Sequence, residues 1–146
     1  MPSELKQRLQ NDLNQARKDR NKDRTLVLST VFSEVKNREI DSREEVTDDG
    51  VIQVISKAIK QRKDAATQMR DAGREELAVI EEAQSAVLAE YLPAGLSEDE
   101  VRDMIRAAIA DGADQMGAVM GRLMPQLRGR FDGGEANRLV REELAG

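Results

Sequence analysis

The residues best suited to bind a ligand lie between positions 116 and 134, where a short apolar segment leads into a turn rich in glycine and arginine. Arg122, Arg128 and Arg130 fall within nine residues of a chain whose net charge is −5. A guanidinium pairs with phosphate through two parallel hydrogen bonds, and Gly129 and Gly133 leave the backbone open to close approach. The spacing predicts a small anion-binding turn. Because a single aromatic residue lies nearby, phosphates of folded RNA suit this turn better than stacked single-stranded bases.

The same three arginines have a structural alternative. A charged turn is often a solvated surface in which guanidiniums pair with neighbouring carboxylates. Here those carboxylates would be Asp132, Glu135 or the acidic segment at residues 98–103. The sequence leaves both interpretations open.

Two glycines stand four residues apart just before this turn. Gly117 and Gly121 share one face of a helix, which predicts tight packing against a neighbouring helix inside a small domain. The alternative is that this face lets a nucleic-acid backbone or a partner helix approach closely. Met116, Met120 and Met124 recur on the same helix, and this spacing is typical of core filler.

Composition excludes several classes of chemistry. The chain has no cysteine and no histidine, so thiolate sites, disulfides and serine–histidine catalysis are ruled out. Adjacent carboxylates on a helix point in different directions, and no phosphate-binding or dinucleotide fingerprint occurs, so we expect neither a metal nor a cofactor.

Basic runs at residues 17–24 and 57–63 are typical of solvated helix faces. With no long apolar run and no signal peptide, a cytoplasmic protein that does not enter a membrane is expected.

The elements that position these residues all have helical periodicity. Residues 1–93 contain four amphipathic stretches, each with a narrow apolar stripe, and the second stripe extends to Ile40. Ser3 and Thr47 are expected N-caps, and Gly73 suits a left-handed C-terminal position. Since narrow stripes can be buried only against one another, helical hairpins should form. We expect an all-α fold in which an elongated N-terminal domain of about four helices occupies residues 1–93.

A second domain is predicted for residues 94–146. Pro93 ends the preceding helix, and Ser97 with Glu100 forms a capping box that starts the next one. Apolar periodicity then predicts three short helices, the second over Met116–Leu127 and the last over residues 135–144. They make a small three-helix C-terminal domain that carries the arginine turn.

The order of several segments matches a known family. They are LKQRLQNDL (5–13), VKNREI (35–40), AGREELA (72–78), EYLP (90–93), LSE (96–98), MGAVMG (116–121) followed by Pro125 and Gly129-Arg130, and NRLVREEL (137–144). In these segments the chain resembles the YqeY-like proteins, stand-alone relatives of the C-terminal region of the GatB subunit of aspartyl/glutamyl-tRNA amidotransferase. It departs from that pattern at Ala118 and Gln126, where the family often has lysine, so its anion site has fewer cations.

The resemblance implies a non-catalytic module that binds tRNA or a tRNA-processing complex, because the corresponding tail of the amidotransferase helps to hold tRNA. On this hypothesis Arg122, Arg128 and Arg130 contact phosphate, Gly129 and Gly133 permit close approach, and the two glycines of the helix set its packing. A protein–protein adaptor without RNA binding is the alternative, with the acidic helix Glu98–Asp111 or the bundle of narrow-striped N-terminal helices as its contact surface. An independent amidotransferase is disfavoured, since the chain offers no nucleophile arrangement and no ATP motif.

Overall fold

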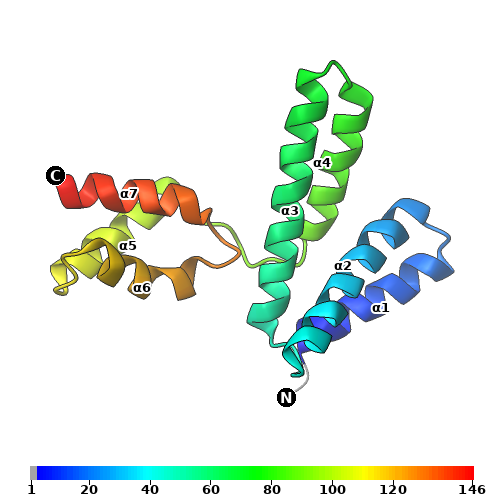
Figure 1. Cartoon of the computed structure of the whole chain (residues 1–146), viewed down its shortest axis with the longest axis horizontal. Coiled ribbons are helices and arrows are strands. Elements are labelled where there is room, and N and C mark those ends of the chain that lie inside the picture. Colours follow the sequence, from blue (N-terminus) through cyan, green and yellow to red (C-terminus); the bar gives the residue numbers. More distant parts are fainter. Residues whose placement is uncertain (1–2) are drawn as a thin grey trace. The chain divides into compact units, whose positions relative to one another are not determined.

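Every regular element in the described part of the chain, residues 3–146 of this computed structural model, is an α-helix, which confirms the predicted all-α class. As Figure 1 shows, the helices are α1 (Glu4–Lys18), α2 (Lys22–Ser42), α3 (Asp48–Asp71), α4 (Glu75–Ala89), α5 (Glu98–Ala110), α6 (Met116–Leu127) and α7 (Gly133–Ala145). Contacts divide the chain into two compact units, of which the first ends at Leu92 and holds α1 to α4, and the second begins at Pro93 and holds α5 to α7. None of these helices is both long and apolar enough to cross a lipid bilayer.

Three of the predicted helix starts are formed by side-chain caps. The hydroxyl of Ser3 accepts a hydrogen bond from the Lys6 amide at 3.0 Å, and Thr47 caps α3 in the same way. Ser97 accepts from the Glu100 amide at 3.1 Å. Among the hydrogen bonds of the described residues, the Ser97 amide does not donate to the Glu100 carboxylate, so only half of the expected capping box exists. The hydroxyl caps satisfy amides that a helix start leaves without partners.

The first unit consists of two helical hairpins, with α1 beside α2 and α3 beside α4 (Figure 1). Its buried side chains come from all four helices and include Leu9, Leu13, Leu28, Val31, Val35, Val51, Ile55 and Leu88. The expected extension of the second stripe is wrong, because Ile40 is 71% exposed near the end of α2. Gly73 follows α3 at φ +76, as its predicted left-handed position requires.

The second unit packs three short helices around one apolar cluster. The cluster joins Val101 and Ile105 of α5, Val119, Leu123 and Leu127 of α6, and Leu139 and Val140 of α7. Met116 and Met120 are partly buried against it, which confirms that they fill the core. The buried side chains of α6 therefore lie on one side of the helix, and its opposite side is exposed to solvent.

Candidate functional site

The outward side of α6 is formed by small residues, a proline and one arginine. Gly117, Ala118, Gly121, Arg122 and Pro125 are all exposed, while the residues between them on the helix point into the core. The positions fall at i, i+1, i+4, i+5 and i+8, so they form one continuous strip along the helix. Ligand atoms could approach the backbone closely along this strip.

The two glycines of this strip do not pack against a neighbouring helix of their unit. A Cβ atom added to Gly117 or to Gly121 would meet no heavy atom of its surroundings within 4 Å. The predicted helix-packing role is therefore wrong within the second unit. The signal was present in the sequence, because each glycine precedes a core valine or leucine by two residues, which is about 200° around the helix. The alternative of close approach by an external backbone is the one that this geometry permits.

The strip also carries a backbone acceptor that its own helix does not use in the usual way. Pro125 lies inside the last turn of α6 and has no amide hydrogen. It therefore cannot donate the hydrogen bond that the carbonyl of Gly121 would receive four residues earlier in the helix. The carbonyl of Gly121 therefore lacks its usual helical donor, and the ring of Pro125 lies next to it.

The turn after α6 is held in place by its own backbone. Gly129 adopts φ +71, a left-handed conformation in which glycine is not strained. The amide of Arg130 donates to the Leu127 carbonyl at 2.8 Å, and the carbonyl of Arg130 accepts from the Leu96 amide at 2.9 Å. A Cβ added to Gly133 would lie 3.8 Å from the Met124 side chain, an ordinary contact. Gly129 is thus required by the turn, whereas sterics alone do not require glycine at 133.

The three arginines predicted to bind phosphate occupy different environments. Arg122 forms an ion pair with Asp111 at 2.9 Å, and both side chains are about half exposed or more. The Nε of Arg130 donates to the Ala94 carbonyl at 3.0 Å, so this guanidinium fastens the turn to the start of the unit. Arg128 follows the exposed strip of α6 and makes neither an ion pair nor a side-chain hydrogen bond with any residue from 3 to 146. Of the three, Arg128 is the guanidinium most available to an external anion.

Three of the carboxylates that were expected to neutralise these arginines have other partners, and none of the expected carboxylates pairs with Arg122, Arg128 or Arg130 within the described residues. Asp132 accepts from the Glu135 amide at 2.9 Å and so caps α7. Glu135 pairs with Arg138 at 2.8 Å, and Glu98 pairs with Arg102 at 3.0 Å. The structural alternative therefore does not apply to Arg128 or Arg130 in the form that the sequence suggested.

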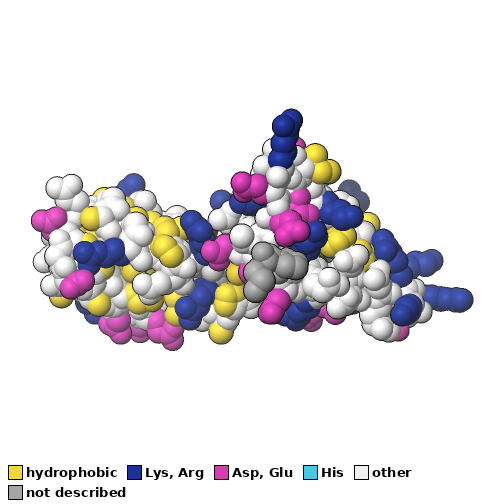
Figure 2. Space-filling view, turned by 90° about the horizontal axis from the view of Figure 1, so that it is seen from below, with side chains coloured by type: hydrophobic (Ala, Val, Ile, Leu, Met, Phe, Trp, Pro, Cys, Tyr) yellow, Lys and Arg dark blue, Asp and Glu magenta, His cyan; other side chains and the backbone are white. Residues whose placement is uncertain are grey.

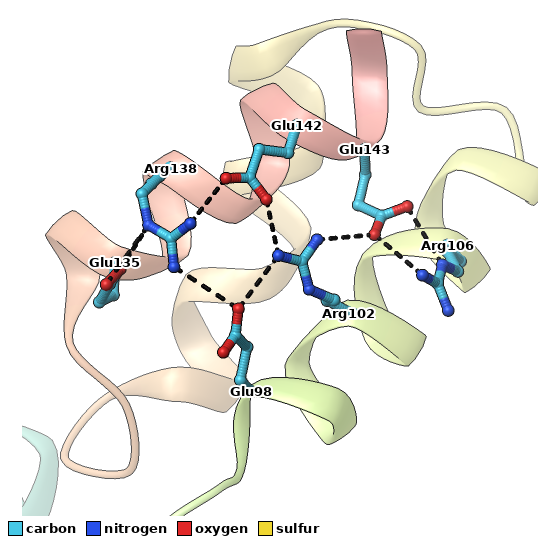
Figure 3. Close-up of polar contacts among 7 residues, drawn as sticks. All are labelled: Glu98, Arg102, Arg106, Glu135, Arg138, Glu142 and Glu143. Carbon is cyan, nitrogen blue, oxygen red and sulfur yellow. Dashed lines mark hydrogen bonds and ion pairs between the residues drawn. The ribbon is translucent and has the colours of Figure 1, made fainter. Parts of the chain in front are cut away.

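These partners belong to an ion-pair network between α5 and α7. Figure 3 draws its members, which are Glu98, Arg102, Arg106, Glu135, Arg138, Glu142 and Glu143. Arg102 is the central cation, with Glu142 at 2.6 Å and Glu143 at 3.0 Å. Hydrogen bonds from Arg106 and then from Arg102 hold the pKa of Glu143 below its ordinary value of 4.5. The network connects two helices and uses the acidic charge of the unit internally.

Sequence reasoning did not identify this network. Its local part was visible, since Glu135, Arg138 and Glu142 lie three and four residues apart on one helix face. The pairing of Arg102 with Glu142 spans forty residues, and only the packing of α5 on α7 brings the two together. Within residues 3–146, no group of three or more acidic side chains is arranged to hold a metal ion.

Comparison with known proteins gives three similarities. The family model described as "Yqey-like protein" matches residues 6–144. The "Altered inheritance of mitochondria protein 41, mitochondrial" of Pyrenophora tritici-repentis is 31% identical over 129 residues, which cover 84% of this chain and 71% of that protein. The "Uncharacterized protein C22F3.15" of Schizosaccharomyces pombe is 40% identical over 76 residues, which cover 52% of this chain and 62% of that protein.

Proposed function

Because this chain belongs to the YqeY-like protein family, we propose that it is a non-catalytic binding module that holds tRNA, or a tRNA-processing complex, in the cytoplasm. In this proposal residues 1–93 and 94–146 act as separate domains. The second domain contacts RNA phosphate and ribose through the exposed strip of α6 and the turn that follows it. No metal or cofactor takes part.

The observation that carries the proposal is the open glycine strip that ends at an unpaired arginine. An RNA backbone can lie against Gly117 and Gly121, since nothing of the unit occupies the space beside them. Arg128 lies at the end of the strip, where it can pair with a phosphate. Such contacts recognise backbone shape rather than base sequence, as expected for a chain with 2% aromatic residues.

Arg122 and Arg130 have supporting roles in this proposal. Arg122 can exchange its exposed partner Asp111 for a phosphate, because such a surface ion pair is weak. Arg130 keeps the turn fastened to the Ala94 carbonyl, and its remaining guanidinium hydrogens are free to face an anion. Gly129 lets the turn hold Arg128 and Arg130 in sequence without backbone strain.

The first test measures, by fluorescence anisotropy, the binding of the purified protein to total tRNA at low salt. Arg128→Ala should make the slope of log K against log salt less negative by about 0.7 to 0.9, the value of one phosphate contact. Arg141→Ala is the matched control, since Arg141 is exposed on α7 of the same unit and removal of its charge should leave the slope unchanged. If the wild-type protein does not bind tRNA at low salt, the proposal fails.

A second pair of variants tests the strip itself. Gly121→Leu adds a branched side chain where nothing of the unit lies within 4 Å of the new Cβ, so the fold should persist while RNA approach is blocked. Ala107→Leu adds similar bulk to an exposed position on α5 and should leave binding intact. Equal binding by these two variants would show that the strip of α6 is not the contact surface.

The alternative function is a protein–protein adaptor. It is favoured by Asp99 and Glu100, which are exposed at the start of α5 and form no ion pair with any described residue. A pull-down that returns the same protein partner before and after nuclease treatment, from a preparation that retains no RNA, would favour the adaptor over the RNA module.

A further inference from the structure

The turn between α1 and α2 carries cations that the rest of the chain does not neutralise. Arg17, Lys18, Arg20 and Lys22 are exposed, and none forms an ion pair or a side-chain hydrogen bond with any residue that the structure describes. Figure 2 shows dark blue side chains projecting at the end of the first unit where α1 meets α2. By contrast, Arg24, the next basic residue in the sequence, is paired with Asp12 and Glu90.

These cations surround a shallow groove with an apolar surface. Its volume is about 510 Å³, and it is lined by Arg17, Arg20, Lys22, Thr25, Leu26 and Ser29. Leu26 is 58% exposed, although most of the large apolar side chains of this unit are buried. A groove of this size accommodates a ligand no larger than a small molecule or a single residue of a polymer.

Arg20, which lines the groove, is held in a left-handed backbone conformation. Arg20 has φ +56, and the next amide, that of Asn21, donates to the Ala16 carbonyl at 3.0 Å. This is the helix-ending arrangement in which glycine is the favoured left-handed residue. An arginine there is less stable than glycine, because its Cβ is crowded in the left-handed conformation. Arg43 adopts the same conformation outside the groove, so the location of Arg20 at the groove and its unpaired charge, rather than its backbone, point to a ligand.

We infer that this groove binds one unpaired nucleotide of an RNA, with the phosphate on Arg17, Arg20 and Lys22 and the base on Leu26. Guanidiniums pair with phosphate in a fork. The exposed side chain of Leu26 can cover one face of a base by van der Waals contact, without the π stacking that an aromatic ring would add. The inference rests on the proposed function, because it gives the same RNA a second contact, now on the first unit.

The surroundings of Leu26 favour a nucleotide over an acidic protein helix. A docked helix needs an apolar stripe with a period of three to four residues. The positions three and four residues after Leu26 are Ser29 and Thr30, whose hydroxyls donate to the Leu26 carbonyl. The apolar surface is thus limited to one leucine and the stems of its cationic neighbours, which is too small for a docked helix.

The variant that best separates loss of an RNA contact from loss of stability is Arg20→Gly, with Arg43→Gly as its matched control. Arg43 is also an exposed arginine in a left-handed conformation, at φ +58 after α2, and it does not line the groove. Each variant removes one charge and relieves the same strain, so each should raise the melting temperature by about 2–4 °C. Only Arg20→Gly should weaken RNA binding, and loss of folding cannot explain the loss.

The probes are an RNA hairpin with an unpaired loop and a blunt RNA duplex with the same number of base pairs. The triple variant Arg17→Ala, Arg20→Gly, Lys22→Ala should make the hairpin salt slope less negative by about 2, at about 0.7 per lost contact. The ratio of wild-type to variant affinity should then grow about 18-fold from 200 to 50 mM salt. Leu26→Ala should lower hairpin affinity equally at every salt concentration.

The outcomes separate the two proposals. If the wild-type protein binds neither RNA, the proposed function and this inference both fail. If it binds the hairpin and the triple variant binds equally well, only the inference is overturned, and an acidic protein segment becomes the occupant that these charges suit. The inference would also be overturned if the triple variant lost as much affinity for the duplex as for the hairpin. Equal losses of hairpin affinity in Arg43→Gly and Arg20→Gly would overturn it in the same way.

Discussion

Alanine in place of the two strip glycines should stabilise the second unit. Gly121 lies in the interior of α6, where glycine is less favourable than alanine by about 1 kcal/mol. Gly117 lies in the first turn of α6, where we expect about half of that gain. Because a Cβ at either position meets no heavy atom within 4 Å, no steric cost offsets these terms. The double variant should gain about 1.5 kcal/mol in the free energy of unfolding.

Hydrogen exchange followed by mass spectrometry is the appropriate assay, because it reports on α6 separately from the first unit. Amides of Met116–Leu127 that exchange by unfolding should slow about tenfold in the double variant, as 1.4 kcal/mol corresponds to a factor of ten in an equilibrium constant. Gly129→Ala is the control within the same segment, since its φ of +71 should make alanine destabilising by about 1 kcal/mol. Faster exchange in the double variant would refute the reasoning, because it would mean that the glycines are packed.

Three further predictions concern the stability of the fold. Gly50→Ala places a Cβ 2.6 Å from the Cγ2 of the buried Val46 and should cost about 1–3 kcal/mol in urea denaturation, whereas helix propensity alone predicts a gain. Tyr91→Phe removes the hydrogen bond to Asp12 and should cost about 1.5–3 kcal/mol by the same assay, the range for bonds to a charged group; no loss would contradict it. The pKa of Glu143 is lowered in the folded protein, so the stabilising effect of this carboxylate should be complete above about pH 4.5 and should disappear as the pH falls through the pKa of the folded state. Glu143→Gln should therefore make the free energy of unfolding in urea less dependent on pH between about pH 3 and 6.

The helices and their ends could be predicted from the sequence because their causes are local. A serine or threonine hydroxyl caps the amide three residues later, as Ser3 and Thr47 do, whatever the rest of the chain does. The same holds for Gly73, whose left-handed position follows from the end of one helix. Ile40 shows the limit of this reasoning, since the apolar pattern continues to it although its side chain is 71% exposed. Its neighbours Arg38 and Glu39 are the residues of this turn that contact α3 and α1.

The candidate site could be predicted from the sequence only in part. Residue types and spacing identified the segment, but they did not distinguish Arg128, which is unpaired, from Arg130, which fastens the turn to Ala94. That difference depends on a chain segment more than thirty residues away. The direction of the two glycines was implicit in the core pattern of α6, yet whether another helix covers that side is a question of packing.

By itself the sequence determined an all-helical chain, the ends of most of its helices, and the family in which its glycine and arginine segment occurs. The tertiary structure decided which charges remain available. Glu98, Glu142 and Glu143 pair with arginines of α5 and α7, whereas Arg128 and the cations of the α1–α2 turn form no ion pair within the described residues. The physical reason is that a helix cap depends on neighbours within four residues, whereas an ion pair across helices depends on which faces pack together.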